Sequence, residues 1–164
     1  VFIQYIQWFC QYISLCYAFN VMNPIIEGKV VKGLGYGKKL GFPTANIDQK
    51  QFVKDKMTLP LGVYAGVVFL HHINKIRKTA IVVGPLDKKK ARPNDRGRTV
   101  GRVPKIEAHI LGFKGRLYGK KLTLYLYKFL RPFEVFKSEK LLIVQIKKDI
   151  KRVKEEIATP AYFT

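Results

Sequence analysis

Five short segments rich in β-branched and aromatic residues, with no helical segment between them, most constrain what this chain can fold into. They cover residues 25–32, 62–70, 78–84, 105–111 and 121–130. In the fourth segment Ile106, Ala108 and Ile110 share one face of a strand, whereas Glu107 and His109 share the other. Short strands joined by glycine-containing connections favour an all-β fold, either an antiparallel barrel or a sandwich.

The C-terminal part of the chain changes to a helical period. Its apolar residues are spaced four, four, three and four apart: Leu142, Ile146, Ile150, Val153 and Ile157. This spacing predicts one amphipathic helix. Ser138 is placed to cap its N-terminus, and Glu139 suits the first turn. The opposite face is basic and is expected to be solvated.

Composition limits the class of protein. The 164 residues fit one domain, and 48% of them are hydrophobic, so wholesale disorder is excluded. Both cysteines lie before residue 22, which excludes a disulfide scaffold or a cysteine-based zinc site in residues 22–164 and suits a cytoplasmic protein. The chain has 31 Lys+Arg against 11 Asp+Glu, a net charge of +20 that attracts polyanions.

The N-terminal segment, residues 1–21, differs from residues 22–164, which we assign to the folded domain. It carries no charge and is long enough to span a bilayer as a helix. Gln4, Gln7 and Gln11 would however form a polar stripe along such a helix. Three interpretations stay open: a docked amphipathic helix, a membrane anchor, or a reading frame extended before Met22.

Three alternating glycines, Gly33, Gly35 and Gly37, form a predicted flexible loop. Their spacing matches neither the dinucleotide-binding fingerprint nor the Walker A loop. Backbone N–H groups in such a loop can still converge on a phosphate, and the following Lys38 would add positive charge.

A longer string containing this loop resembles the start of the riboflavin kinase family. It runs from Gly28 through the three glycines to Gly41-Phe42-Pro43-Thr44-Ala45-Asn46. The resemblance continues in order with Glu107-Ala108-His109-Ile110-Leu111 and with Leu130-Arg131-Pro132-Phe133, and it covers about residues 25–157.

The resemblance implies a fold and an activity. The expected fold is a six-stranded antiparallel closed barrel with a C-terminal helix packed beside it, the sixth strand lying around residues 47–58. The expected activity is transfer of the γ-phosphate of ATP to the 5′-hydroxyl of riboflavin, which gives FMN and ADP. We expect a monomer.

The resemblance also implies roles for individual residues. Glu107 would be the general base, and Thr44 and Asn46 would hold Mg²⁺ together with the nucleotide phosphates. The nucleotide-binding set is Gly33, Gly35, Gly37, Lys38, Pro43, Thr44 and Asn46. The flavin-binding set is Arg131, Pro132 and Phe136. His109 is expected to be structural.

The sequence departs from the family pattern in several places. Val82 stands where the family commonly has an asparagine. The segment 87–104 is strongly basic, which suggests an alternative: an inactive kinase-like barrel that binds nucleic acid. This segment has no aromatic residue on which a base could stack, so the alternative is not favoured. Membrane binding is expected only if residues 1–21 are an anchor.

Overall fold

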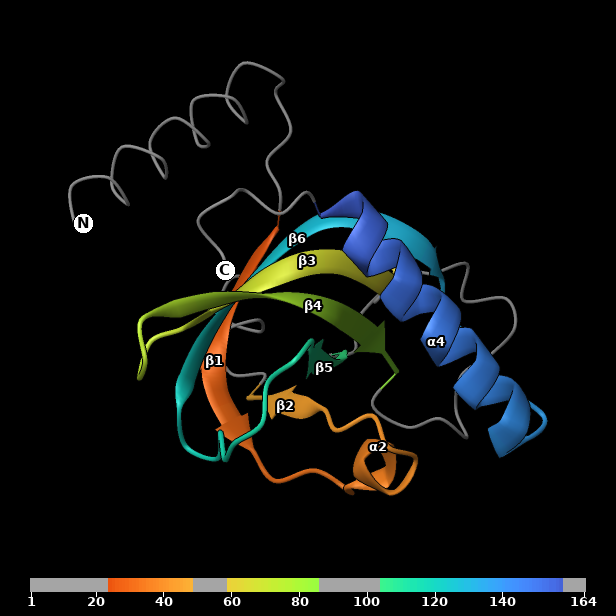
Figure 1. The fold of residues 1–164 in the computed structure, drawn as a ribbon, viewed down its shortest axis with the longest axis horizontal. Helices are drawn as coiled ribbons and strands as arrows, with labels where there is room; N and C mark the ends of the chain where they lie inside the picture. Colours follow the sequence, from red (N-terminus) through yellow and green to blue (C-terminus); the bar gives the residue numbers. More distant parts are fainter. Residues whose placement is uncertain (1–23, 49–58, 86–103, 158–164) are drawn as a thin grey trace, which may run out of the picture.

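A computed structural model describes residues 24–48, 59–85 and 104–157. Six antiparallel strands close into a barrel in the order β1-β2-β5-β4-β3-β6 (Figure 1). The elements are β1 (Ile25–Val31), α2 (Tyr36–Lys39), β2 (Ala45–Ile47), β3 (Gly62–Leu70), β4 (Lys75–Gly84), β5 (Lys105–Ile110), β6 (Lys121–Pro132) and α4 (Glu139–Glu156). The predicted barrel with a C-terminal helix is therefore confirmed.

The sixth strand is β2, and it overlaps the predicted range of 47–58 only at Ile47. It contains the Ala-Asn pair of the sequence string and bonds to two neighbours, with Val30 opposite Ile47 and Ala45 opposite Ala108. Three residues are too few to show a two-residue alternation, which is why the pattern missed it. Residues 49–58 lie outside the described ranges.

The glycine loop also differs from the expectation of a purely irregular segment. Residues Tyr36–Lys39 form one helical turn, α2, between Gly35 and Leu40. Gly35 has a φ of 70° and Gly41 has a φ of 87°, so left-handed glycines stand on both sides of the turn. α2 buries no residue, and Figure 1 shows it projecting from the barrel beyond β2.

The barrel interior is filled by the apolar face of each strand. On β5 the buried residues are Ile106, Ala108 and Ile110, as the alternation predicted. Leucines of β6 and aliphatic residues of β3 and β4 complete the core: Val68, Leu70, Ile81, Val83, Leu122, Leu124 and Leu126. The opposite face of the same strands is left free to build a site.

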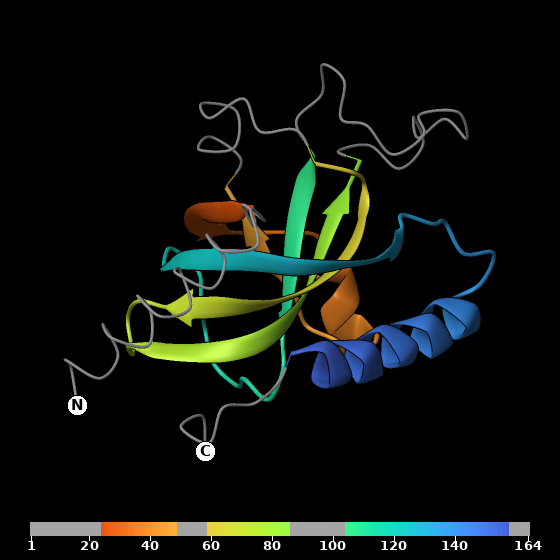
Figure 2. The same ribbon diagram turned by 90° about the horizontal axis from the view of Figure 1, so that it is seen from above.

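α4 covers part of that outer face. It contacts β3, β4 and β6, and the turned view shows it running along one side of the barrel (Figure 2). Val153 is fully buried against Val63, Ala65, Ala80 and Leu130. The predicted cap is present, since the Ser138 hydroxyl accepts a hydrogen bond from the Leu141 N–H at 3.3 Å.

Two expectations concern segments that are not described. Residues 1–21 lie entirely outside the described ranges, and so do residues 87–103 of the basic segment. In the part of the chain that is described, no helix has the length and apolar character needed to cross a bilayer.

Candidate active site

One row of residues crosses the outer face of the barrel through five neighbouring strands. The pairing register places Asn46 beside Glu107, Glu107 beside Val82, Val82 beside Val63, and Val63 beside Arg131. Each of these residues lines the same cleft. Strand pairing therefore brings together residues that are far apart in the sequence. The apolar pair Val82 and Val63 lies in the middle of the row, with polar residues on either side.

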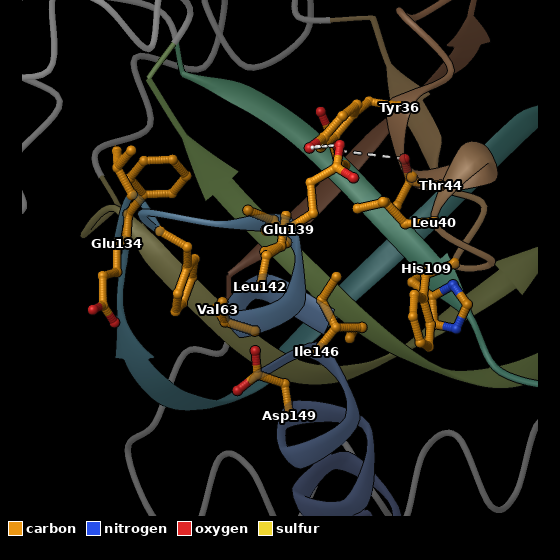
Figure 3. A pocket seen from close by; sticks show the side chains of 18 of the residues that line it. Tyr36, Leu40, Thr44, Val63, His109, Glu134, Glu139, Leu142, Ile146 and Asp149 are labelled. Atoms are coloured by element: carbon orange, nitrogen blue, oxygen red, sulfur yellow. Dashed lines mark hydrogen bonds between the residues drawn. The ribbon is translucent and has the colours of Figure 1, made fainter. Parts of the chain in front are cut away.

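The cleft has a volume of about 680 Å³ and lies between this row and the start of α4. Leu142, Ile146 and Asp149 of α4 form one wall, and Tyr36, Leu40 and Thr44 stand across from them (Figure 3). Residues 133–138, which connect β6 to α4, close one end. The cleft is therefore apolar in its middle and polar at its ends.

Glu107 presents its carboxylate to one end of the cleft. The Thr44 hydroxyl donates a hydrogen bond to Glu107 Oε2, with an oxygen–oxygen distance of 3.3 Å. The Lys105 ammonium forms an ion pair with Glu107 Oε1. The Glu107 side chain keeps 26% of its surface exposed, so the carboxylate is held at both oxygens and still open to a substrate.

Asn46 supplies a second oxygen at the same end. Its Oδ1 atom is buried and has no hydrogen-bond partner among the described residues. A Cβ atom added to Gly33 would lie 2.2 Å from Asn46 Nδ2, so a side chain at this position would push the amide out of its present place. An unpartnered buried oxygen is costly, which indicates that a ligand completes this corner.

The oxygen atoms at this corner fit a hard divalent cation. A hydroxyl, an amide oxygen and a carboxylate are ligands of the kind that Mg²⁺ accepts. In the described residues, no group of three or more His, Cys, Asp or Glu side chains could enclose a metal ion. Mg²⁺ usually takes most of its ligands from water and phosphate oxygens, so this small set of protein oxygens suits a metal that arrives with a nucleotide.

The other end of the cleft is held by a buried ion pair. Arg131 donates from Nη2 to Asp149 Oδ2 at 2.7 Å and from Nε to Asp149 Oδ1 at 3.0 Å. Gln145 adds a hydrogen bond to Asp149 Oδ1 at 2.9 Å. The Arg131 guanidinium carbon lies 5.6 Å from the centre of the Phe136 ring. These contacts tie β6, α4 and the 133–138 connection together.

A hydrogen bond spans the mouth of the cleft. The Tyr36 hydroxyl donates to Glu139 Oε1 at 2.8 Å, joining α2 to the first turn of α4 (Figure 3). Hydrogen bonding to the Glu139 carboxylate raises the pKa of Tyr36, because the anionic tyrosine would lose this bond and repel the acid. Tyr36 therefore remains a neutral donor at physiological pH.

Comparison with known proteins assigns a family to this arrangement. A family model described as riboflavin kinase matches residues 22–157. The chain belongs to the riboflavin kinase family. It is 33% identical over 133 residues to a bifunctional riboflavin kinase/FMN adenylyltransferase of Buchnera aphidicola, which covers 79% of this chain and 38% of that protein.

Two further comparisons extend the family assignment. A riboflavin kinase of Candida glabrata is 29% identical over 154 residues, with 81% of this chain and 82% of that protein covered. The crystal structure of a riboflavin kinase from Trypanosoma brucei shares the fold, with a TM-score of 0.53 at 22% identity over 83% of this chain and 80% of that one. The chain spans about two fifths of the length of its bifunctional bacterial relatives.

Most of the residues predicted from the family resemblance meet in the cleft. Those that line it are Gly35, Gly37, Thr44, Asn46, Glu107, Arg131 and Phe136. Gly33 lies against Asn46. Lys38, Pro43 and Pro132 are not among the lining residues, whereas Lys39 is. His109 Nδ1 lies 2.8 Å from the Pro43 carbonyl oxygen, which can only accept, so the ring donates this hydrogen bond and supports the loop. His109 also lines the cleft, and its expected structural role stays a prediction.

Among the lining residues that were not assigned a site role from the sequence, three carry polar groups that matter below: Tyr36, Lys105 and Glu139. Lys105 is two residues before Glu107 on one strand, so their shared face was a signal available in advance. The contact between Tyr36 and Glu139 joins residues 103 positions apart and left no such signal. Val82, the departure from the family pattern, lies directly beside Glu107.

Proposed function

We propose that the chain phosphorylates the 5′-hydroxyl of riboflavin with ATP, giving FMN and ADP. The observation that carries the proposal is the meeting of Glu107, Thr44 and the unpartnered oxygen of Asn46 at one end of an otherwise apolar cleft. The Glu107 carboxylate can accept a proton, and the neutral oxygens of Thr44 and Asn46 can bind a metal ion that carries the phosphates. Family membership supports the same activity.

In the proposed reaction Glu107 accepts the hydroxyl proton of riboflavin. The hydroxyl oxygen forms its bond to the γ-phosphorus as the bond from that phosphorus to the β,γ-bridging oxygen breaks. The electron pair of the broken bond leaves with ADP. General-base help of this kind contributes roughly 10²–10⁴-fold, and alignment of the reactants contributes most of the remainder.

Mg²⁺ would be held by Thr44 and Asn46 beside the phosphates, where it would supply charge neutralisation. The Thr44 hydroxyl bonds to Glu107 Oε2, so a cation on the hydroxyl oxygen would leave the carboxylate and the metal site side by side. Gly35 and Gly37 line this end, and we assign them to the cover over the nucleotide.

The apolar middle of the cleft suits the flavin. Glu107 and Arg131 are three strands apart in the row, which is about 14 Å at the usual spacing of strands. Val82 and Val63 lie between them, and Leu142 and Ile146 of α4 lie opposite. A flat apolar ring between these walls, with its sugar-like chain directed to Glu107, fits the chemistry of both ends.

The test is FMN formation from riboflavin, ATP and Mg²⁺, followed by chromatography. We expect product from the wild type and at least about 10²-fold less from Glu107→Gln. Glu155→Gln is the matched control, because Glu155 is an exposed acid of α4 outside the cleft. Equal activity of Glu107→Gln and the control would remove Glu107 from the reaction.

The same assay tests the alternatives. A wild type that forms no FMN but binds RNA in a salt-sensitive way would support the nucleic-acid module instead. The proposal retains the cytoplasmic location and the monomeric state expected from the sequence. Loss of membrane binding on deletion of residues 1–21 would indicate an anchor and would revise the location alone.

A further inference from the structure

Lys105 occupies a defined position at the nucleotide end of the cleft. It follows the fully buried Pro104 and begins β5, so its backbone is anchored. Its partner on the neighbouring strand is Gly84, which has no side chain to compete for the space. Its own side chain is 27% exposed and its ammonium contacts Glu107 Oε1. Lys105 is therefore directed into the cleft beside the proposed base.

The other cations of the cleft are placed differently. Arg131 is committed to Asp149. Lys39 belongs to α2, and Lys137 belongs to the connection at the opposite end. Neither lysine has a described contact with Glu107. Among the cations that line the cleft in the described part of the chain, Lys105 is therefore the one whose charge contacts the proposed base.

Geometry sets how far this ammonium is from the transferred phosphate. The attacking hydroxyl must lie within about 3.2 Å of Glu107 and about 3.5 Å of the γ-phosphorus. The γ-phosphorus is then within roughly 7 Å of the carboxylate that Lys105 already contacts. A lysine side chain with four rotatable carbons can cover this distance without movement of β5.

We propose that Lys105 is a further catalytic residue that binds the γ-phosphate of ATP during transfer, an inference that rests on the proposed kinase activity. Before the nucleotide binds, the ammonium is the counter-ion of Glu107. With ATP bound it is shared between the carboxylate and the phosphate oxygens. It keeps all its protons throughout, while the hydroxyl proton passes to Glu107 and the bridging electron pair leaves with ADP.

This role serves two needs of the site. Glu107 and the triphosphate are both anionic and must approach within a few ångströms, so a cation between them reduces their repulsion. Negative charge on the transferred group and on the leaving oxygen is stabilised by a fixed donor in the same place. Thr44 and Asn46 carry no charge of their own, so Lys105 would add to the charge neutralisation that Mg²⁺ supplies with the nucleotide.

Nucleotide binding gives a test that needs no turnover. Affinities for ADP and for the β,γ-imido analogue of ATP are measured with Mg²⁺ by calorimetry for the wild type, Lys105→Met, Lys105→Arg and Lys147→Met. Lys147 is an exposed lysine of α4 outside the cleft and controls for the loss of one charge. We expect Lys105→Met to weaken the analogue about tenfold or more and ADP less than about twofold. We expect Lys105→Arg to stay close to the wild type.

Kinetics separate this role from a purely structural one. Lys105→Met is expected to lower kcat about 10²-fold and to change the KM for riboflavin less than about threefold, with the melting temperature of the control variant. If Lys105→Met weakened both nucleotides equally, or neither of them, the ratio of their affinities would be unchanged and the assignment would be overturned. If Lys105→Met melts early, Lys105→Gln decides on the same ratio. A wild type that forms no FMN would instead refute the kinase proposal itself.

Discussion

Two ion pairs stand near opposite ends of the same cleft, and they differ in almost every physical respect. Arg131 and Asp149 are joined by three hydrogen bonds, two from Nε and one from Nη2, and only 6% of the Asp149 side chain is exposed. Lys105 and Glu107 are joined through one carboxylate oxygen, and each keeps about a quarter of its side chain exposed. The first pair connects a strand to a helix, whereas the second lies within one strand.

This difference in burial indicates that one pair has a structural role and the other a role in the reaction. A charge that is buried and fully hydrogen-bonded cannot easily exchange its partner for a substrate, because the exchange would leave the other charge unpaired. A partly exposed charge can exchange its partner for a substrate at little cost, because water reaches both groups. We therefore assign Arg131–Asp149 to shaping the flavin end of the cleft, and Lys105–Glu107 to the reacting groups.

The largest expected effect tests this assignment directly. Asp149→Asn leaves the Arg131 charge buried without its partner, so we expect it to lower the free energy of unfolding by about 3–5 kcal/mol. Glu107→Gln removes a partly exposed pair and should lower the free energy of unfolding by no more than about 1 kcal/mol, although we expect it to abolish most of the activity. Urea unfolding followed by circular dichroism measures both values.

A double variant supplies the control. Arg131→Met combined with Asp149→Leu removes both charges, and it should recover part of the stability that Asp149→Asn loses. The comparison between the two pairs would be wrong if Glu107→Gln destabilised the protein as much as Asp149→Asn. It would also be wrong if the double variant were less stable than the single one.

The positions of most strands were predictable because these strands are long enough to show their period, whereas the closed six-stranded barrel was predicted from the family resemblance. The segment 62–70 coincides with β3, and the buried face of β5 was read from alternation alone. Two elements escaped for a shared reason. β2 has three residues and α2 has four, so neither completes enough repeats to display a pattern. β2 is fixed by its pairing with β1 and β5, and α2 is bounded by left-handed glycines.

The site was predictable in its residue types but not in its geometry. Family resemblance supplied Glu107, Thr44 and Asn46, which do meet in the cleft. The row from Asn46 to Arg131 depends on the register of five paired strands, which no local pattern encodes. The contrast between the two ion pairs likewise depends on burial, and burial at residue 149 is decided by where α4 packs.

An intermediate effect sharpens the argument that burial sets the cost of a charge. The Tyr64 hydroxyl, inside the barrel wall, donates to the Pro60 carbonyl oxygen at 2.7 Å. Burial raises the pKa of Tyr64 from its ordinary value of 10.0 to about 12. The unfolded chain therefore loses this proton first, so stability should fall as the pH rises from about 10 to about 12.

The difference of two between these pKa values corresponds to at most about 2.7 kcal/mol, and to less in so far as water reaches the hydroxyl. Urea unfolding between pH 9 and pH 12 measures the loss. Tyr64→Phe is the control, because it removes the titrating group while keeping the edge contact with the Phe129 ring. Parallel pH profiles for the wild type and Tyr64→Phe would show that burial here does not penalise the anion.

The smallest expected effect concerns the hydrogen bond that spans the mouth of the cleft. The bond runs from the Tyr36 hydroxyl to the Glu139 carboxylate, and it links the side chains of α2 and α4. Because α2 buries no residue and is flanked by left-handed glycines, this bond should retain a bound product. Tyr36→Phe is expected to speed FMN dissociation, measured by flavin fluorescence in stopped flow, by about two- to tenfold.

Glu139→Gln tests the other partner, and Tyr118→Phe, an exposed tyrosine outside the cleft, is the matched control. If the bond acts as one unit, the double variant will release FMN no faster than the quicker single variant. Additive acceleration would mean that each residue contacts the product separately, so that the two ends of the cleft are not coupled through this bond.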